Sequence, residues 1–255
     1  MEKMGIGLQL YTLRDDLARD FAGTLRVVAE MGYEGVEFAG YGNLSADDMK
    51  KLLDELGLKA VGSHIALKRL DDDIAGEIAY LKTIGAAYGI VPHLAEADRA
   101  DEATWEKTIA RLSAHAAEFA KHGLKLGYHN HAFEFELKLD GEYVFDAIYS
   151  KTSPDQLVVE MDLGWVQYAG EDPLAYIAKY EGRLPLLHLK DFRKAAPGEP
   201  IDTVELGEGD LNLPALIEAA GAAKVEWIIV EQDRCANPPL QSVRTSREWL
   251  KSNYK

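Results

Sequence analysis

Short apolar runs alternate with longer amphipathic stretches along the whole chain. Runs rich in Val, Ile, Leu and Tyr are typical of buried strands, whereas apolar residues every three or four positions are typical of helices. Their alternation predicts βα units around a parallel sheet. The runs that fit strands are Gly5–Leu10, Gly35–Phe38, Lys59–His64, Tyr88–Pro92, Lys125–His131, Leu157–Asp162, Leu184–Lys190 and Trp227–Glu231. Eight such strands predict an α/β fold of the (β/α)8 TIM-barrel type.

Helix start and stop signals separate the predicted strands. The stretches of helical period include Phe21–Glu30, Ser45–Leu56, Ile74–Ile84 and Trp105–Lys121. Ser45 offers a hydroxyl N-cap, and Gly57 follows the last turn of the same helix as a left-handed stop. Equivalent stops are expected at Gly32, Gly85 and Gly123, and first-turn prolines at Pro173 and Pro214.

One irregular stretch interrupts the pattern, from Arg193 to Asp210, with KAAPGEP followed by LGEGD. In a barrel this stretch follows the seventh strand on the catalytic face. Both a functional loop and an ordinary surface loop fit this composition.

Composition narrows the class of protein. A length of 255 residues suits one barrel domain over residues 1–255. The net charge of −15 opposes binding to nucleic acid or to an anionic membrane surface. Cys235 is the one cysteine, which excludes an internal disulfide, and no cysteine-protease pattern surrounds it. The N-terminus has neither a cationic start nor a long apolar run, so we expect a cytoplasmic protein.

Ionisable residues close three successive strands of the predicted barrel. Asp162 ends VVEMD, His188 lies in LLHLKDF, and Glu231 follows WIIV directly. Each alone could be a cap, a satisfied core histidine or one half of an ion pair. Because strand ends of this fold converge on one mouth, the three together predict a metal site.

The fifth strand ends in YHNHAFEFE and should supply a further ligand. His129 and His131 share one face of the strand, Asn130 takes the other, and Glu134 and Glu136 follow. Mixed imidazole and carboxylate ligands suit Mn, Mg, Co, Zn or Fe. We expect one divalent metal ion, with manganese favoured.

At these residues the chain resembles the sugar phosphate isomerase/epimerase family of xylose-isomerase-like TIM barrels, which includes inosose dehydratases and tagatose 3-epimerase-like enzymes. The resemblance runs through LQLYTLR, GYEGVEFAGYG, GSH, YHNHAFEFE, MDLGWV, LLHLKDF, LGEGD and IIVEQD. It implies that Asp162, His188 and Glu231 bind the metal, and that His64 and Lys190 contact substrate.

The resemblance breaks at the fifth strand. Many relatives have a Glu followed by Asn-His, where this chain has His129 before Asn130 and His131. Either His129 replaces that Glu as a ligand, or Glu134 folds back to the metal and leaves His129 for proton transfer. Glu134 is the favoured ligand, and Glu160 and Glu136 are the next candidates.

The resemblance implies an isomerase or epimerase that moves a proton next to the carbonyl of a sugar or keto sugar through a metal-stabilised enediolate. Glu134, Glu231, His129 and His131 are the candidate catalytic residues. The alternative is a dehydratase acting on an inosose or 3-keto sugar. An endonuclease IV-like phosphodiesterase and a non-catalytic sugar-binding barrel are less favoured. The expected partner is a small-molecule sugar or cyclitol, and a homo-oligomer stays open.

Overall fold

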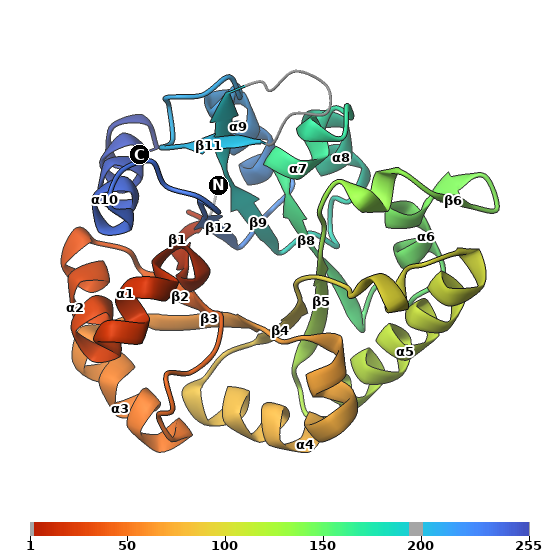
Figure 1. The fold of residues 1–255 in the computed structure, drawn as a ribbon, viewed down its shortest axis with the longest axis horizontal. Coiled ribbons are helices and arrows are strands. Elements are labelled where there is room, and N and C mark those ends of the chain that lie inside the picture. The colour runs from red at the N-terminus through yellow and green to blue at the C-terminus, as the bar shows by residue number, and fades with distance from the viewer. Residues whose placement is uncertain (1–2, 194–200, 255) are drawn as a thin grey trace.

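A closed barrel of parallel strands forms the centre of the computed structural model, which describes residues 3–193 and 201–254 (Figure 1). The strand order around the barrel is β1-β12-β9-β8-β5-β4-β3-β2. The predicted TIM barrel is therefore confirmed. Its strands are β1 (Gly5–Gln9), β2 (Gly35–Phe38), β3 (Lys59–His64), β4 (Tyr88–Val91), β5 (Lys125–His129), β8 (Leu157–Asp162), β9 (Leu186–Leu189) and β12 (Trp227–Val230).

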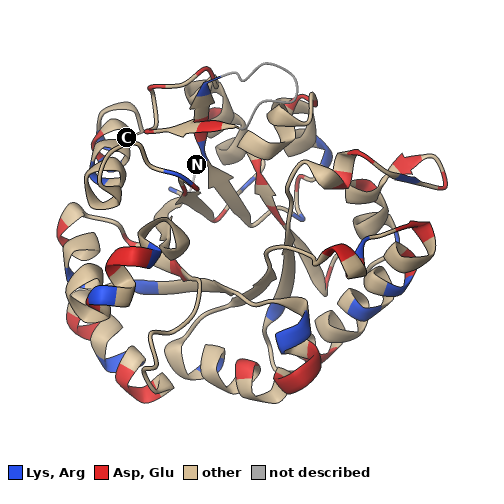
Figure 2. Cartoon of the chain, in the orientation of Figure 1, with Lys and Arg blue, Asp and Glu red and all other residues tan. Residues whose placement is uncertain are grey.

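Helices surround the strands as an outer layer (Figure 1). The α-helices are α1 (Arg14–Arg19), α2 (Phe21–Met31), α3 (Ala46–Leu56), α4 (Leu67–Ile84), α5 (Glu102–Lys121), α6 (Val144–Ser150), α7 (Leu163–Tyr168), α8 (Pro173–Lys179), α9 (Leu213–Ala222) and α10 (Pro239–Asn253). Short 3-10 turns lie at η1 (Leu10–Leu13), η2 (Glu96–Asp98) and η3 (Phe133–Phe135). Lys, Arg, Asp and Glu are spread over this outer layer (Figure 2). No helix of the described residues combines the length and the hydropathy that crossing a membrane requires.

The local signals act as predicted. The hydroxyl of Ser45 accepts a hydrogen bond from the Asp48 amide at 3.2 Å, and Gly57 ends α3 with a φ of 67°. The helix predicted from Ile74 begins earlier, at Leu67, and is broken at Asp73, whose φ is −155°. Asp73 caps the second part by accepting from the Gly76 amide at 3.0 Å, so the predicted start corresponds to this internal cap.

The stretch predicted as one irregular loop, Arg193 to Asp210, is partly regular. β10 (Asp191–Arg193) and β11 (Asp202–Val204) pair as an antiparallel ribbon, and residues 194–200 lie outside the described residues. The Asp191 carboxylate accepts from the amides of Gly207, Gly209 and Leu211 at 2.9 to 3.2 Å. A buried carboxylate that gathers three backbone donors fixes the return of the chain over the barrel.

Two apolar regions stabilise the barrel. The larger packs the outer faces of the strands against the helices. The smaller fills the barrel interior and consists of Val61, Tyr88, Ile90, Val158, Leu186 and Ile229. This inner cluster forms an apolar floor for the polar layers of the mouth.

The two ends of the chain close the barrel together. β1 pairs in parallel with β12, and the buried Tyr33 hydroxyl donates to the Val243 carbonyl of α10 at 2.8 Å. Arg247 and Lys251, also on α10, donate to the carbonyls that end α2, those of Gly32 and Met31. The last helix therefore locks the first βα unit in place.

Tyr33→Phe should lower the free energy of unfolding by about 1 kcal/mol, because it removes a buried hydrogen bond between the two ends of the chain. Metal affinity and turnover should not change, since this contact lies on the helical layer. Denaturant unfolding measures the effect, with Tyr11→Phe as control because Tyr11 is 45 % exposed. Equal losses in both variants would contradict a role in closure.

Candidate active site

The polar mouth of the barrel is built by the two-residue period of its strands. Val158, Leu186 and Ile229 lie on the apolar floor. Because side chains alternate along a strand, residues two positions further on each strand also point inward. These next residues are Glu160, His188 and Glu231, followed by Asp162, Lys190 and Asp233, and in this way polar layers replace the apolar floor.

Four buried side chains form the first candidate metal group: His129, Asp162, His188 and Glu231. Each offers one ligand atom, and these atoms all lie within 4.8 Å of one another. His188 Nδ1 is 3.0 Å from Glu231 Oε2, and His129 Nε2 is 3.8 Å from Asp162 Oδ2. The structure thus brings together the three predicted strand-end ligands and His129.

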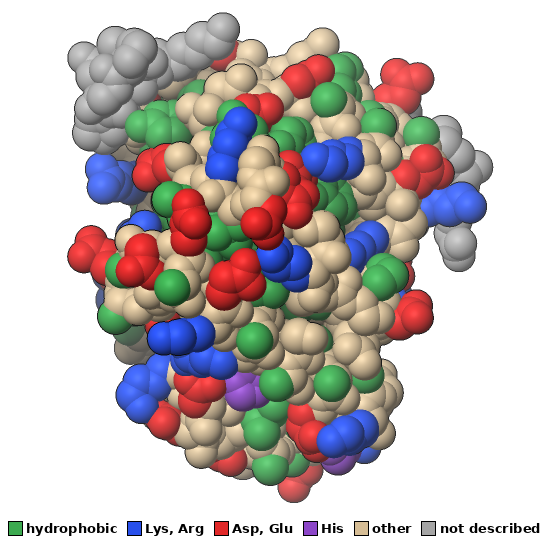
Figure 3. Space-filling view, turned by 90° about the vertical axis from the view of Figure 1, so that its right-hand side faces the viewer, with side chains coloured by type: hydrophobic (Ala, Val, Ile, Leu, Met, Phe, Trp, Pro, Cys, Tyr) green, Lys and Arg blue, Asp and Glu red, His purple; other side chains and the backbone are tan. Residues whose placement is uncertain are grey.

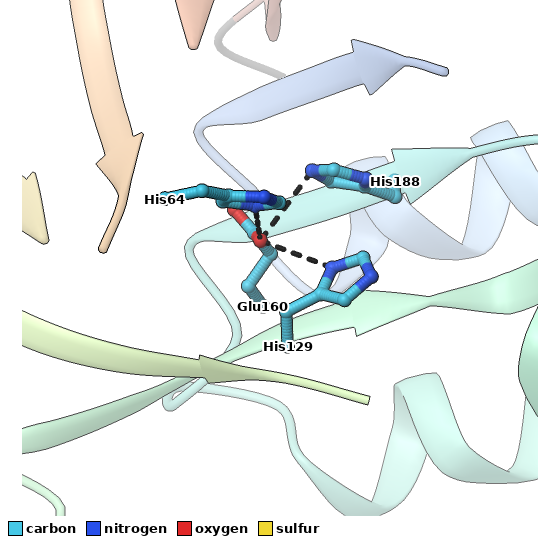
Figure 4. A group of neighbouring side chains, drawn as sticks. All are labelled: His64, His129, Glu160 and His188. Carbon is cyan, nitrogen blue, oxygen red and sulfur yellow. Dashed lines mark hydrogen bonds and ion pairs between the residues drawn. The ribbon is translucent and has the colours of Figure 1, made fainter. Parts of the chain in front are cut away.

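A second group lies around Glu160 (Figure 4). Its Oε2 atom is 2.9 Å from His64 Nε2, 3.1 Å from His129 Nδ1 and 3.4 Å from His188 Nε2. Glu37, from β2, adds a second carboxylate, whose Oε2 is 2.7 Å from His188 Nε2. Burial alone would lower the pKa of His64, but Glu37 and Glu160 raise that pKa to about 10.

The buried Lys190 neutralises part of the acidic mouth. Its Nζ atom is 2.9 Å from Asp162, 3.1 Å from Glu231 and 2.6 Å from Asp233. Burial alone would lower the pKa of Lys190, but the three carboxylates raise it well above its ordinary value. The ammonium predicted to contact substrate is thus held by carboxylates of the protein itself.

Glu134, the favoured fourth ligand, lies outside both groups of the described residues. Its carboxylate accepts from the Tyr128 hydroxyl at 2.7 Å and from the His131 amide at 2.8 Å. Burial raises the pKa of Glu134 to about 7, although these donors oppose the shift. Metal binding by Glu134 stays a prediction that this geometry does not favour, and Glu136 is exposed to solvent.

His131 is held on the cavity side of the site by aromatic neighbours. Its ring stacks on Phe133 with centroids 5.7 Å apart, and His93 and Trp165 lie 5.2 and 5.4 Å away. Burial, followed by the nearby Lys190 charge, lowers the pKa of His131 to about 3. Its Nδ1 atom makes no hydrogen bond among the described residues.

Sequence reasoning missed Glu37, Asp233 and Gln9, and it ranked Glu160 only as a reserve ligand. Gln9 Nε2 donates to Glu37 Oε2 at 2.8 Å inside the barrel. One signal was present: Glu37 interrupts the fully buried strand GVEF, and a carboxylate there requires partners. The residues that pair with Glu37 are determined by which strands face β2 across the closed barrel.

A cavity of about 530 Å³ opens directly above these groups. Its lining includes His64, His129, His131, Glu231 and Asp233, with Arg14 and Arg234 among the outer residues. This volume is in the range of small-molecule sites.

The residues of the first group fit a divalent cation. Asp162 Oδ2 is fully buried and accepts no hydrogen bond from the described residues. Its positive neighbour is Lys190, whose Nζ lies 2.9 Å away. The donor set of two imidazoles and two carboxylates is one that Zn, Mn, Fe and Co accept.

Comparison with known proteins agrees with this geometry. Residues 25–253 match the family described as the xylose isomerase-like TIM barrel. The chain belongs to this family. Within it, an inosose dehydratase of Mesomycoplasma hyopneumoniae (strain J) is 26 % identical over 293 residues, which cover 98 % of this chain and 95 % of the relative.

Solved structures of other proteins show the same fold. A sugar phosphate isomerase/epimerase from Parabacteroides distasonis superposes with a TM-score of 0.82 at 22 % identity, covering 100 % of this chain and 96 % of that one. The IOLI protein, solved with a bound zinc atom, superposes with a TM-score of 0.75 at 15 % identity, covering 99 % of this chain and 100 % of the other.

Glu134→Gln should change how stability depends on pH. The pKa of Glu134 rises from 4.5 to about 7 on folding, so its stabilising contribution is complete below pH 4.5 and is lost as the pH rises to 7. The glutamine cannot ionise. From pH 5 to 7, the variant should therefore gain about 1.4 kcal/mol per pH unit relative to the parent, and nothing further above pH 7.

Denaturant unfolding between pH 5 and 8 measures this difference. Glu205→Gln is the matched control, since burial of Glu205 is outweighed by bonds from Ser242 and Asn237 and its pKa is lowered. The stability difference between Glu205→Gln and the parent should not change between pH 5 and 8. If the stability difference between Glu134→Gln and the parent were also independent of pH, the raised pKa of Glu134 would be contradicted.

Proposed function

We propose that the chain is a divalent-metal-dependent dehydratase acting on an inosose or a related keto sugar. The observation that carries this proposal is the set of four buried ligand atoms of His129, Asp162, His188 and Glu231 beside the cavity. These residues would hold the ion, with His129 in the place that the resemblance assigns to a Glu. The zinc atom bound by the IOLI protein supports a metal in this fold, and the metal identity stays open.

Loss of water next to a carbonyl needs a base for the α-proton and an acid for the leaving hydroxyl. A bound divalent ion would supply positive charge where the substrate oxygen becomes negative. His131 and His64 both line the cavity but differ in their neighbours. Such differences in environment separate a base from an acid.

His131 suits the base. Its Nδ1 atom makes no hydrogen bond among the described residues, and the lowered pKa of His131 keeps the ring neutral, so that an imidazole nitrogen can take the α-proton. His64 suits the acid, because Glu37 and Glu160 flank its Nε2 at 3.1 and 2.9 Å and keep its ring protonated. The C–O bond then breaks, and the hydroxyl leaves as water with the proton that His64 supplies. Glu231 lines the same cavity and Lys190 contacts Glu231, so one negative and one positive charge lie next to the bound substrate.

An isomerase or epimerase is the second candidate, supported by the Parabacteroides distasonis structure. It would use the same first step, but the proton would return to carbon and no hydroxyl would leave. The inosose dehydratase relative covers nearly the full length of both chains, which favours the dehydratase. A phosphodiesterase acting on DNA is opposed by the net charge of −15 and by the mixture of both signs of charge on the face in Figure 3.

Removal of the metal with a chelator should abolish turnover, and Asp162→Asn should weaken metal binding at least about 10-fold. His131→Asn should keep the metal and lose about 10² to 10⁴ in turnover, because it removes only the base. Calorimetric titration with Mn²⁺ and with Zn²⁺ gives the affinities. Mass spectrometry of inosose and keto-sugar reactions in deuterated water identifies products lighter by one water.

Glu205→Gln is the control, since it alters a buried carboxylate bonded to Ser242 and Asn237. An isomeric product that has lost no water, with or without one deuterium bound to carbon, would assign the isomerase instead. Full activity in the metal-free protein would reject the proposal.

A further inference from the structure

Two imidazoles separate the two groups of carboxylates in the mouth. His188 presents Nδ1 to Glu231 at 3.0 Å and Nε2 to Glu37 at 2.7 Å. His129 presents Nε2 to Asp162 at 3.8 Å and Nδ1 to Glu160 at 3.1 Å. Figure 4 shows that Glu160 faces one nitrogen of each ring. The other nitrogen of each ring lies toward Asp162 or Glu231.

This placement bears on which nitrogen can bind a metal. A neutral imidazole has one lone-pair nitrogen and one N–H group, and the hydrogen bond made by the N–H decides which nitrogen is which. A carboxylate that accepts this bond also orients the ring and raises the basicity of the other nitrogen.

We propose that Glu37 and Glu160 are positioning residues that select the metal-binding nitrogens of His188 and His129. This inference rests on the proposed function. Glu37 accepts the N–H of His188 Nε2, which leaves Nδ1 with the lone pair. Glu160 accepts the N–H of His129 Nδ1, which leaves Nε2 with the lone pair.

Both carboxylates are fixed in place by further donors. Glu37 Oε2 accepts from Gln9 Nε2 at 2.8 Å, and His64 Nε2 is 3.1 Å from the same oxygen. His64 Nε2 also lies 2.9 Å from Glu160 Oε2, so one imidazole ties the two carboxylates together. Neither carboxylate is exposed to solvent. Their geometry is therefore set by the barrel interior before any ligand enters.

A second metal ion among Glu37, His64 and Glu160 is the competing interpretation. An ion there and another in the first group would both need His129 and His188 as ligands. Each ring would then bind metal through both nitrogens and would have to lose its last proton. If Glu37 and Glu160 instead accept hydrogen bonds from these rings, each ring keeps one N–H and needs to bind only one ion.

The experiment compares Gln and Leu at each position. Glu37→Gln and Glu160→Gln keep an oxygen acceptor and should weaken Mn²⁺ binding by less than about 10-fold, whereas Glu37→Leu and Glu160→Leu should weaken it by about 10 to 100-fold. In the Co²⁺-loaded protein, paramagnetic NMR should show two exchangeable imidazole N–H signals. Glu37→Leu should lose or broaden the signal of His188, and Glu160→Leu the signal of His129. Glu205→Gln should leave both signals and the affinity unchanged.

Circular dichroism and unfolding of the metal-free variants establish that they fold, and Glu37→Ala and Glu160→Ala, which also remove the acceptor, carry the test if a Leu variant does not. Unchanged affinity and unchanged N–H signals in all variants would overturn the inference while the parent still binds one ion. Two ions per chain, with one lost in Glu37→Gln, would also overturn it. A parent chain that binds no Mn²⁺ and no Zn²⁺ would instead reject the proposed function.

Discussion

The buried carboxylates in the mouth of this barrel must be balanced by positive charge, and the rest of the site depends on this constraint. Glu37, Glu160, Asp162 and Glu231 are at most 5 % exposed, and Asp233 lies beside them. Lys190 supplies one positive charge against these five negative ones. An uncompensated buried charge costs several kcal/mol, so the remaining balance must come from imidazoles or from a cation. The imidazoles of His64 and His188 answer this requirement, because the carboxylates raise their pKa values against the effect of burial, whereas burial lowers the pKa of His129.

The barrel makes this concentration of charge possible. The apolar floor of Val158, Leu186, Ile229 and their neighbours keeps water out from below. The two-residue period of the same strands then turns carboxylates and imidazoles toward one axis. Because these side chains come from β2, β3, β5, β8 and β9 and from the end of β12, their distances hold only while the barrel is closed. The contacts of α10 with the first βα unit stabilise this closure from the helical layer.

The sequence was sufficient for the parts of this arrangement that local pattern controls. Alternating apolar runs predict every barrel strand, and Asp162, His188 and Glu231 follow from ionisable residues at strand ends. The partners of Glu37 and Glu160 could not be predicted, because they depend on which strands face each other across the closed barrel. Glu134 was favoured as a ligand on its sequence distance from the strand. The η3 turn instead returns its carboxylate to Tyr128 on β5, the strand just before it.

A crystal structure of the Mn²⁺-loaded protein, with the ion identified by its anomalous scattering, would show directly which side chains bind the metal. The account predicts one ion, with ligand distances of about 2.0 to 2.6 Å to His129 Nε2, Asp162, His188 Nδ1 and Glu231. Glu37 and Glu160 should stay in contact with the opposite ring nitrogens. An ion bound by Glu134 in place of His129, or by Glu37 and Glu160, would contradict the account.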